Sequence, residues 1–350
     1  MKAAMLYGPM DMRYEEKEKP TPKCGEARIK VSACGVCGSD YPRILDGTAH
    51  YFPIILGHEF AGIVDEVGPE VDDLERGDSV VAVPLVPCMK CPACREHHYS
   101  LCNNYRFIGT RCDGGYAEYA VLPASNLIKM KTDADTKLAA LMEPATVALH
   151  GIRRSGMPNN AETTGVVGGG TIGTFCTEWL RIRNAKMITV MGRDRTRLEI
   201  NRELGATHTF STLDDDAEAQ ALAVTDDEGY AYVYETGGTS ETLKMAIRLT
   251  ARRGTICLIG CLPGEITFGK SEWEQIARKE LQVVGSWMSG GAPYPGEDWE
   301  DAVRCYEDGS LRITEDLLGV KLPLSRANEL PTILQDSNRP KGRILLLCDE

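Results

Sequence analysis

The stretch TTGVVGGGTIGTFCTEWLRIR, residues 163–183, decides the fold that we expect. It starts as a buried strand, turns at a run of glycines and continues with the apolar period of a helix. Gly168, Gly170 and Gly173 have the G-x-G-x-x-G spacing. Such glycines permit a tight turn and let backbone N–H groups approach a pyrophosphate at the helix N-terminus. The stretch therefore predicts a dinucleotide-binding turn.

The sequence that follows repeats the order of strand and helix. The runs MITVMG (187–192), YAYVYETGG (230–238) and GTICLIGC (254–261) predict buried strands, and SETLKMAIRLTARR (240–253) predicts a helix. Strands that alternate with helices indicate a parallel sheet covered on both faces. We expect a doubly wound α/β domain of the Rossmann type over residues 148–288.

The two ends of the chain have a different pattern, with short strands and many turns. The N-terminal strand candidates are ARIKVSA (27–33), EFAGIVDEV (59–67), DSVVAVPLV (78–86) and YAEYAVL (116–122). Beyond Ser289 we expect one helix near DWEDAVRCYEDG and a last strand at RILLLC. Residues 1–147 and 289–350 should therefore form one β-rich domain, into which the α/β domain is inserted.

Charge and composition restrict the class of protein. The 350 residues include 39 Lys and Arg against 51 Asp and Glu, a formal net charge of −12, which disfavours a nucleic-acid partner. The first residues have no signal-peptide pattern, and no run approaches the roughly 18 apolar residues of a membrane span. Thirteen cysteines then indicate thiols in a reducing compartment. We expect a cytoplasmic protein without a membrane partner.

Four cysteines lie in the short run PCMKCPACREHHYSLC, residues 87–102. They are Cys88, Cys91, Cys94 and Cys102. This spacing brings four thiolates close enough to surround one ion, as a tetrahedral Zn²⁺ site requires. The spacing alone leaves open whether the metal supports a loop or takes part in chemistry.

A second set of possible zinc ligands is spread along the chain. Cys37 and Ser39 lie in CGVCGSD, and His58 and Glu59 lie in GHEFAG. Alone they would mean little, because a single histidine is more often a core or surface residue. However, GHEFAG, CGVCGSD, the four-cysteine run, MEP and GGGTIG together resemble the zinc-containing medium-chain dehydrogenases, in the same order and over essentially the whole chain.

That resemblance implies a GroES-like fold for the β-rich domain and two zinc ions per chain. It implies that Cys37, His58 and Glu143 are ligands of a catalytic zinc, with Glu59 binding directly or through water. Such a site keeps one open position for an alcohol, whereas four cysteines leave none. The four-cysteine run then holds the structural zinc.

The resemblance also implies a reaction, in which an alcohol passes a hydride to a nicotinamide and becomes a ketone. Ser39 is the expected proton relay. Many relatives continue the relay through a histidine three residues later, where this chain has Pro42, so the proton exit is left open. A zinc or redox sensor without turnover is the alternative of another class, and the complete ligand set argues against it.

Segments such as GSDYPRI and YPGEDWEDA resemble a polyol-phosphate branch of the family. The expected substrate is therefore a sugar-alcohol phosphate such as galactitol 1-phosphate, with an unphosphorylated polyol of the sorbitol type as the alternative. A phosphate needs cationic donors in its pocket. The candidates are Arg43, His50, Arg111 and Lys270, each of which could also be an ordinary surface charge.

The second strand of the α/β domain carries the signal for cofactor preference. In an NAD-binding fold an acid stands about 20 residues after the glycine turn, whereas this chain has Gly192 there. Arg193 and then Arg197 could hold a 2′-phosphate, which predicts NADP in preference to NAD. The alternative is that Asp194 holds the ribose of NAD.

Four further residues complete the expected cofactor contacts: Thr171, Ile172, Thr236 and Gly260.

The run LQVVGSWM (281–288) is apolar and β-prone, and it closes the inserted domain. An uncovered strand edge there would pair with another subunit, as relatives do, so we expect a homo-oligomer, either a dimer or a tetramer.

Overall fold

The computed structural model describes residues 1–261 and 264–349. The chain divides into two compact units. The first unit, here the catalytic unit, comprises Met1–Glu143, Gly290–Gly309 and Ile313–Glu350. The second, here the nucleotide unit, comprises Pro144–Ser289 and Ser310–Arg312. The predicted domain boundaries at 147/148 and 288/289 stay a prediction.

The nucleotide unit contains a six-stranded sheet in which each strand is parallel to its neighbours, in the order β13-β12-β11-β14-β15-β16. The strands are β11 (Thr163–Val167), β12 (Met187–Gly192), β13 (His208–Ser211), β14 (Tyr230–Glu235), β15 (Thr250–Leu258) and β16 (Gln282–Gly285). Apolar side chains of β11, β12, β14 and β15 are buried in one core cluster, as the sequence pattern predicts. This is the doubly wound sheet that the sequence predicts.

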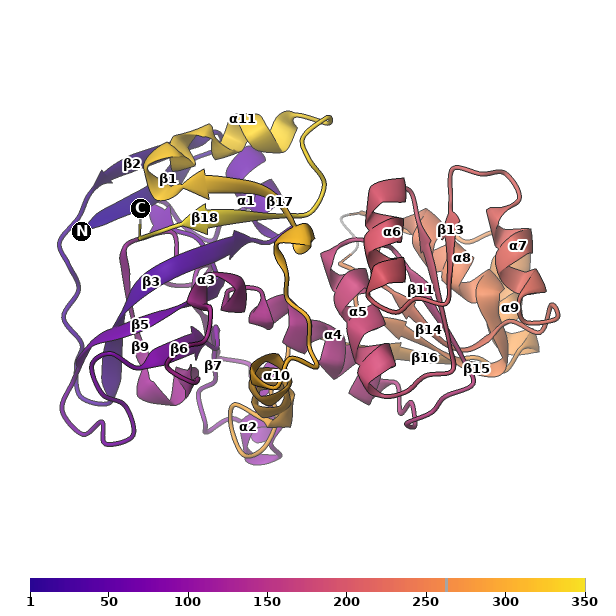
Figure 1. The fold of residues 1–350 in the computed structure, drawn as a ribbon, viewed down its shortest axis with the longest axis horizontal. Helices are drawn as coiled ribbons and strands as arrows, with labels where there is room; N and C mark the ends of the chain where they lie inside the picture. The colour runs from indigo at the N-terminus through magenta and orange to yellow at the C-terminus, as the bar shows by residue number, and fades with distance from the viewer. Residues whose placement is uncertain (262–263, 350) are drawn as a thin grey trace. The chain divides into compact units, whose positions relative to one another are not determined.

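Helices cover both faces of this sheet. Figure 1 shows α5 and α6 on one face, and α7, α8 and α9 on the other. The helices of this part of the chain are α4 (Met142–Arg154), α5 (Thr171–Ile182), α6 (Arg195–Glu203), α7 (Ala217–Ala223), α8 (Ser240–Leu249) and α9 (Lys270–Arg278). The helix predicted over 240–253 ends earlier, at Leu249, because Thr250 already pairs with Tyr230 as the first residue of β15.

The catalytic unit is built around a seven-stranded sheet with the order β10-β6-β5-β3-β18-β17, in which β9 also pairs with β3. Its strands are β3 (Glu26–Val36), β5 (Glu59–Val67), β6 (Ser79–Ala82), β9 (Tyr119–Pro123), β10 (Leu127–Lys129), β17 (Leu318–Pro323) and β18 (Arg343–Leu347). The C-terminal strand β18 runs antiparallel to β3, so the two ends of the chain share one sheet (Figure 1).

Two smaller sheets complete the β structure of the catalytic unit. They are β2-β1-β4, with β1 (Lys2–Gly8), β2 (Asp11–Glu16) and β4 (Ile54–Ile55), and β7-β8, with β7 (Leu85–Val86) and β8 (Arg106–Phe107). Its helices are α1 (Asp40–Leu45), α2 (Pro92–Arg95), α3 (Thr136–Ala139), α10 (Glu297–Glu307) and α11 (Leu330–Gln335). Short 3-10 helices span Tyr99–Leu101, Ala124–Asn126, Glu315–Leu317 and Leu324–Glu329. Over the residues that the structure describes, no helix has the length and apolar character needed to cross a membrane.

Candidate metal centres and cofactor-binding turn

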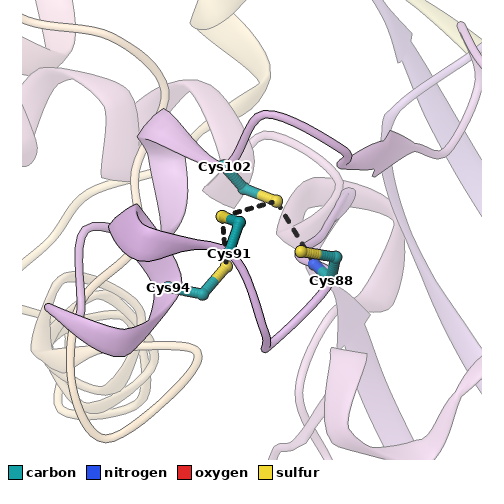
Figure 2. A group of neighbouring side chains, drawn as sticks. All are labelled: Cys88, Cys91, Cys94 and Cys102. Carbon is teal, nitrogen blue, oxygen red and sulfur yellow. Dashed lines mark hydrogen bonds between the residues drawn. The ribbon is translucent and has the colours of Figure 1, made fainter.

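The four cysteines of residues 87–102 converge on one point (Figure 2). Cys88 follows β7, Cys91 caps the N-terminus of α2, Cys94 lies within α2, and Cys102 ends a 3-10 helix. The Cys91 sulfur lies 3.5 Å from the Cys94 sulfur and 3.9 Å from the Cys102 sulfur. All four sulfur atoms lie within 4.8 Å of one another. Such a set matches a closed tetrahedral site.

The surroundings of these sulfur atoms fit a zinc ion. Hydrogen bonds from the backbone of Cys94 and Asn103 lower the pKa of the Cys91 thiol to about 6. A backbone hydrogen bond from Lys90 lowers the pKa of Cys88. Burial instead raises the pKa of Cys94 to about 12, so a cation is needed to hold this thiol as a thiolate. This is a structural zinc site with four cysteine ligands.

A second cluster forms where β3 and β5 run antiparallel. Gly35 pairs with Glu59 in this ladder, so the residues that follow β3 and precede β5 lie side by side. Ligand atoms of Cys37, His58 and Glu59 lie within 4.8 Å of one another. A Cβ atom at Gly35 would lie 2.3 Å from Glu59 Oε2, so a larger residue there would displace the carboxylate. The pairing of two strands thus brings distant residues of the sequence to one site.

This second cluster also fits a metal ion. His58 is 4% exposed and Glu59 is fully buried. Neither carboxylate oxygen of Glu59 nor Nδ1 of His58 has a hydrogen-bond partner in the part of the chain that the structure describes. Buried polar atoms without partners are costly, and a bound cation would satisfy them. Cys37 is only partly buried, which leaves one side of the cluster accessible.

Glu143 lies in the first turn of α4 and is buried beside this cluster. Burial raises the pKa of Glu143 to about 8, and the charges of Glu59 and Cys37 act in the same direction. A cation would therefore favour its ionised form. Among the described residues, the set whose ligand atoms all lie within 4.8 Å of one another consists of Cys37, His58 and Glu59, and it does not include Glu143. The donor set is that of a catalytic Cys/His/Glu zinc site.

Two buried residues that sequence reasoning missed orient this cluster. Asp40 accepts hydrogen bonds from Tyr116 Oη and from Arg43 Nη1, both at 3.0 Å, and its Oδ1 lies 3.8 Å from His58 Nδ1. Arg343, the first residue of β18, lies 3.2 Å from Glu59 Oε2 through its Nε. Asp40 directly follows the CGS motif and could have been noticed. Arg343 has no local signal, since only the sheet brings it near.

The residues predicted to bind the phosphate of the substrate belong to both units. Arg43 donates through Nη1 to the Ser39 carbonyl at 2.7 Å and to Ser39 Oγ at 3.0 Å. His50 is exposed as a whole residue. Partial burial of its imidazole, followed by the charges of Arg111 and Arg43, lowers its pKa. Lys270, in contrast, begins α9 in the nucleotide unit, and its side chain is 89% exposed.

The glycine turn joins β11 to α5 as predicted. Gly168 has a φ of +116°, and a Cβ there would lie 2.6 Å from Thr236 Oγ1. Thr236 Oγ1 donates to the Gly168 carbonyl at 2.9 Å, which fixes the turn. Gly170 is the N-cap of α5, and a Cβ at Gly173 would collide with the Gly168 carbonyl.

The other predicted cofactor contacts lie near this turn. Thr171 and Ile172 are the first residues of α5 and are partly exposed, so the helix N-terminus is accessible. Gly260 follows β15, where a Cβ would lie 2.5 Å from the backbone nitrogen of Gly238. Backbone N–H groups at a helix N-terminus are suited to bind a pyrophosphate.

The end of β12 separates the residues predicted to set cofactor preference. Gly192 is buried at the end of the strand, and Arg193 is exposed directly after it. Asp194 caps α6, where it accepts a hydrogen bond from the Arg197 backbone at 2.8 Å. The Arg197 side chain is 4% exposed, and its Nη2 donates to Thr174 Oγ1 at 3.0 Å. Its guanidinium is thus engaged inside the unit.

Comparison with known proteins agrees with this architecture. Residues 23–132 match the alcohol dehydrogenase GroES-like domain, and residues 171–308 match the zinc-binding dehydrogenase domain. Galactitol 1-phosphate 5-dehydrogenase from Escherichia coli K12 is 37% identical over 82% of this chain and 83% of its own.

Two solved structures are similar over nearly the whole chain. The crystal structure of galactitol-1-phosphate dehydrogenase from Escherichia coli has a TM-score of 0.93 and 34% identity, and it covers 99% of this chain and 100% of its own. A zinc-binding dehydrogenase from Sinorhizobium meliloti 1021 bound to NADP has a TM-score of 0.89 and 29% identity, over 99% and 98% of the two chains.

We predict that the two metal centres have separable roles. Cys91→Ala should remove one zinc ion per chain and lower the thermal unfolding midpoint by roughly 5–10 °C, because structural zinc contributes directly to folding. Cys37→Ala should abolish turnover with little loss of stability, because it removes one ligand of the catalytic zinc. Cys24→Ala, at an exposed thiol, is the control. Elemental analysis that finds one zinc ion or none in active, freshly purified protein would contradict the assignment.

Proposed function

Since this chain belongs to the zinc-binding medium-chain dehydrogenases, we propose that it oxidises a secondary alcohol of a sugar-alcohol phosphate, such as galactitol 1-phosphate, or catalyses the reverse reaction. The observation that carries this is the Cys37, His58 and Glu59 cluster with its accessible side, beside Arg43. The relative that is 37% identical has galactitol 1-phosphate as its named substrate. An unphosphorylated polyol is the second candidate.

The residues of the chain divide the work of the reaction. Zinc, when bound, polarises the substrate oxygen as a Lewis acid. The charges of Asp40, 3.8 Å from His58, and Arg343, 3.2 Å from Glu59, favour the positions of these two side chains. The Ser39 hydroxyl receives a hydrogen bond from Arg43 and also forms a hydrogen bond with the Cys37 thiol. Its proton is the one that we propose is shared with the substrate oxygen.

The proton path beyond Ser39 differs from that of relatives with a histidine in the relay. Pro42 stands at that place and is exposed on α1. Proline has no ionisable group, and Arg43 does not give up its proton at working pH. The path beyond Ser39 therefore runs through water or another group, and not through either of these side chains.

For the cofactor, we propose NADP in preference to NAD, with Arg193 as the main contact to the 2′-phosphate. Gly192 offers no carboxylate to repel that phosphate, and Asp194 is already used as a helix cap. Arg193 is exposed at the end of β12, where it can turn toward the ribose. Arg197, the second predicted contact, is engaged by Thr174 and contributes less.

We further propose a cytoplasmic homo-oligomer, either a dimer or a tetramer, that uses β16. This strand pairs only with β15 among the described strands and is therefore a sheet edge. Val283 on the strand is 47% exposed and Trp287 beyond it is 50% exposed, so the edge is apolar. An apolar edge strand invites pairing with a second copy. In the part of the chain that the structure describes, none of the 13 cysteines is joined in a disulfide, which supports a reducing compartment.

Steady-state kinetics test the substrate. We expect kcat/KM for galactitol 1-phosphate to exceed that for galactitol by about 10- to 100-fold, which is the value of one or two charge-assisted hydrogen bonds. A panel of polyols and their phosphates, measured with both nicotinamide cofactors, gives this ratio. Equal values for each pair would favour the unphosphorylated polyol, and no turnover on any polyol would rule out both substrates.

Cofactor titration tests the role of Arg193. Arg193→Ala should weaken NADP binding about tenfold or more and change NAD binding less than about twofold, because only NADP has the 2′-phosphate. Arg202→Ala, at an exposed arginine in the last turn of α6, is the control and should change neither. Tighter NAD binding in the unmutated protein, or equal losses for both cofactors, would show the proposal to be wrong.

Light scattering at micromolar concentration tests the assembly. The unmutated protein should have the mass of a dimer or tetramer. Val283→Lys should reduce it to a monomer, because a lysine on the strand edge disfavours pairing. Leu213→Lys, at a 65% exposed leucine beyond the opposite edge strand β13, is the matched control and should keep the mass. A monomeric unmutated protein would exclude the proposed assembly.

A further inference from the structure

Arg111 lies on a turn that is fixed against the segment leading to His58. The Arg111 backbone N–H donates to the Phe107 carbonyl at 2.8 Å, which closes the turn. Beyond the turn, the Gly114 N–H donates to the Ile55 carbonyl at 2.9 Å. Two sets of backbone bonds thus set the position of Arg111 relative to the catalytic metal cluster.

A series of ring contacts connects His58 to the Arg111 side chain. The His58 and Phe107 rings lie 5.4 Å apart, and the Phe107 and Tyr105 rings lie 6.5 Å apart. The Arg111 guanidinium stands over the Tyr105 ring at 4.7 Å. Stacking on an aromatic face leaves the N–H edge of a guanidinium available for oxygen ligands. Arg111 is therefore a fixed cation near the catalytic metal cluster.

Arg43 places a second cation beside the same cluster. Its Nη1 is held by Ser39 and by Oδ1 of the buried Asp40. Arg43 is partly buried, whereas Arg111 is exposed. Asp40 balances the positive charge of Arg43. The Arg43 guanidinium can therefore orient a bound anion through hydrogen bonds more than it attracts the anion by net charge.

His50 is the third basic residue of this region, exposed a few residues beyond the end of α1. The Asp46 and Thr48 N–H groups donate to the Pro42 carbonyl, so the segment before His50 folds back on α1. Partial burial, followed by the charges of Arg111 and Arg43, lowers the pKa of His50. Across the described residues, no carboxylate lies within 4.0 Å of Arg111 or His50 to balance them.

The nearest acidic side chains of these segments are already used. Asp113 accepts the Ile55 N–H at 3.0 Å and lies 3.8 Å from the Lys17 ammonium. Asp40 is engaged by Tyr116 and Arg43. Of the three basic groups only Arg43 is paired with a carboxylate, so an anion can balance the charges of the other two.

We propose that Arg43, His50 and Arg111 form the subsite that binds the phosphate group of the substrate. This rests on the proposed function and names the residues that recognise the end of the substrate away from the reacting carbon. A phosphomonoester has three terminal oxygens, which two guanidinium groups and an imidazole can all engage, whereas a carboxylate has only two. Lys270, the fourth sequence candidate, is not part of this subsite.

The test compares charge-removing variants of the zinc-loaded protein. Arg111→Gln should lower the ratio of kcat/KM for galactitol 1-phosphate to that for galactitol by about 10- to 100-fold. His50→Gln should lower the same ratio by a smaller factor, and both sites are exposed, so the fold should tolerate the changes. Arg76→Gln removes one charge from an exposed turn of the same unit and is the control. Arg43 is left unchanged because it also holds Ser39.

Calorimetry with inorganic phosphate separates this subsite from the proposed function. Phosphate should bind the unmutated protein saturably and more tightly than an aldonate, and Arg111→Gln should weaken that binding. If the unmutated enzyme prefers the phosphorylated polyol but Arg111→Gln and Arg76→Gln behave alike, the subsite is overturned and the function stands. If the enzyme does not prefer the phosphorylated polyol, the substrate proposal fails. If, in addition, phosphate does not bind or an aldonate binds more tightly than phosphate, the subsite is overturned as well.

Discussion

The antiparallel pairing of β3 with β5 is the constraint on which the catalytic site depends. It places the end of one strand at Val36 opposite the start of the other at Glu59, so that Cys37 and His58 meet. On its other side β3 pairs with β18, which brings Arg343 to Glu59. A one-residue slip in either ladder would turn these side chains to the opposite face of the sheet. Register therefore fixes the geometry of the metal centre.

Charge balance explains why this buried site needs a divalent cation. With a Cys37 thiolate and ionised Glu59 and Glu143, three negative groups face one positive group, Arg343, which leaves a formal charge of −2. Buried like charges otherwise favour their neutral forms. Asp40 is paired with Arg43 and adds nothing to the sum. A zinc ion cancels the remainder, so the metal and the protein charges are complementary.

Burial and capping also decide which groups remain available for ligands. Asp194 and Arg197 stand beside Arg193 in the sequence, yet the first caps α6 and the second is buried against α5. Only Arg193 remains exposed at the end of β12 among these three. The same holds on the substrate side, where Arg111 is exposed and Arg43 is bonded to Ser39 and Asp40. Local structure thus selects a few charges from several candidates.

By itself the sequence determined the main strands of the α/β domain, the glycine turn and the four-cysteine site, because each is encoded by local spacing. The periodicity of 163–183 predicts β11, its turn and α5, and Cys88–Cys102 lie within one short loop. Only the tertiary structure decided that Arg343 supports Glu59, that Asp40 lies against His58 and that the Phe107 ring packs against His58. These contacts join segments distant in the chain, and only strand register and loop packing bring them together.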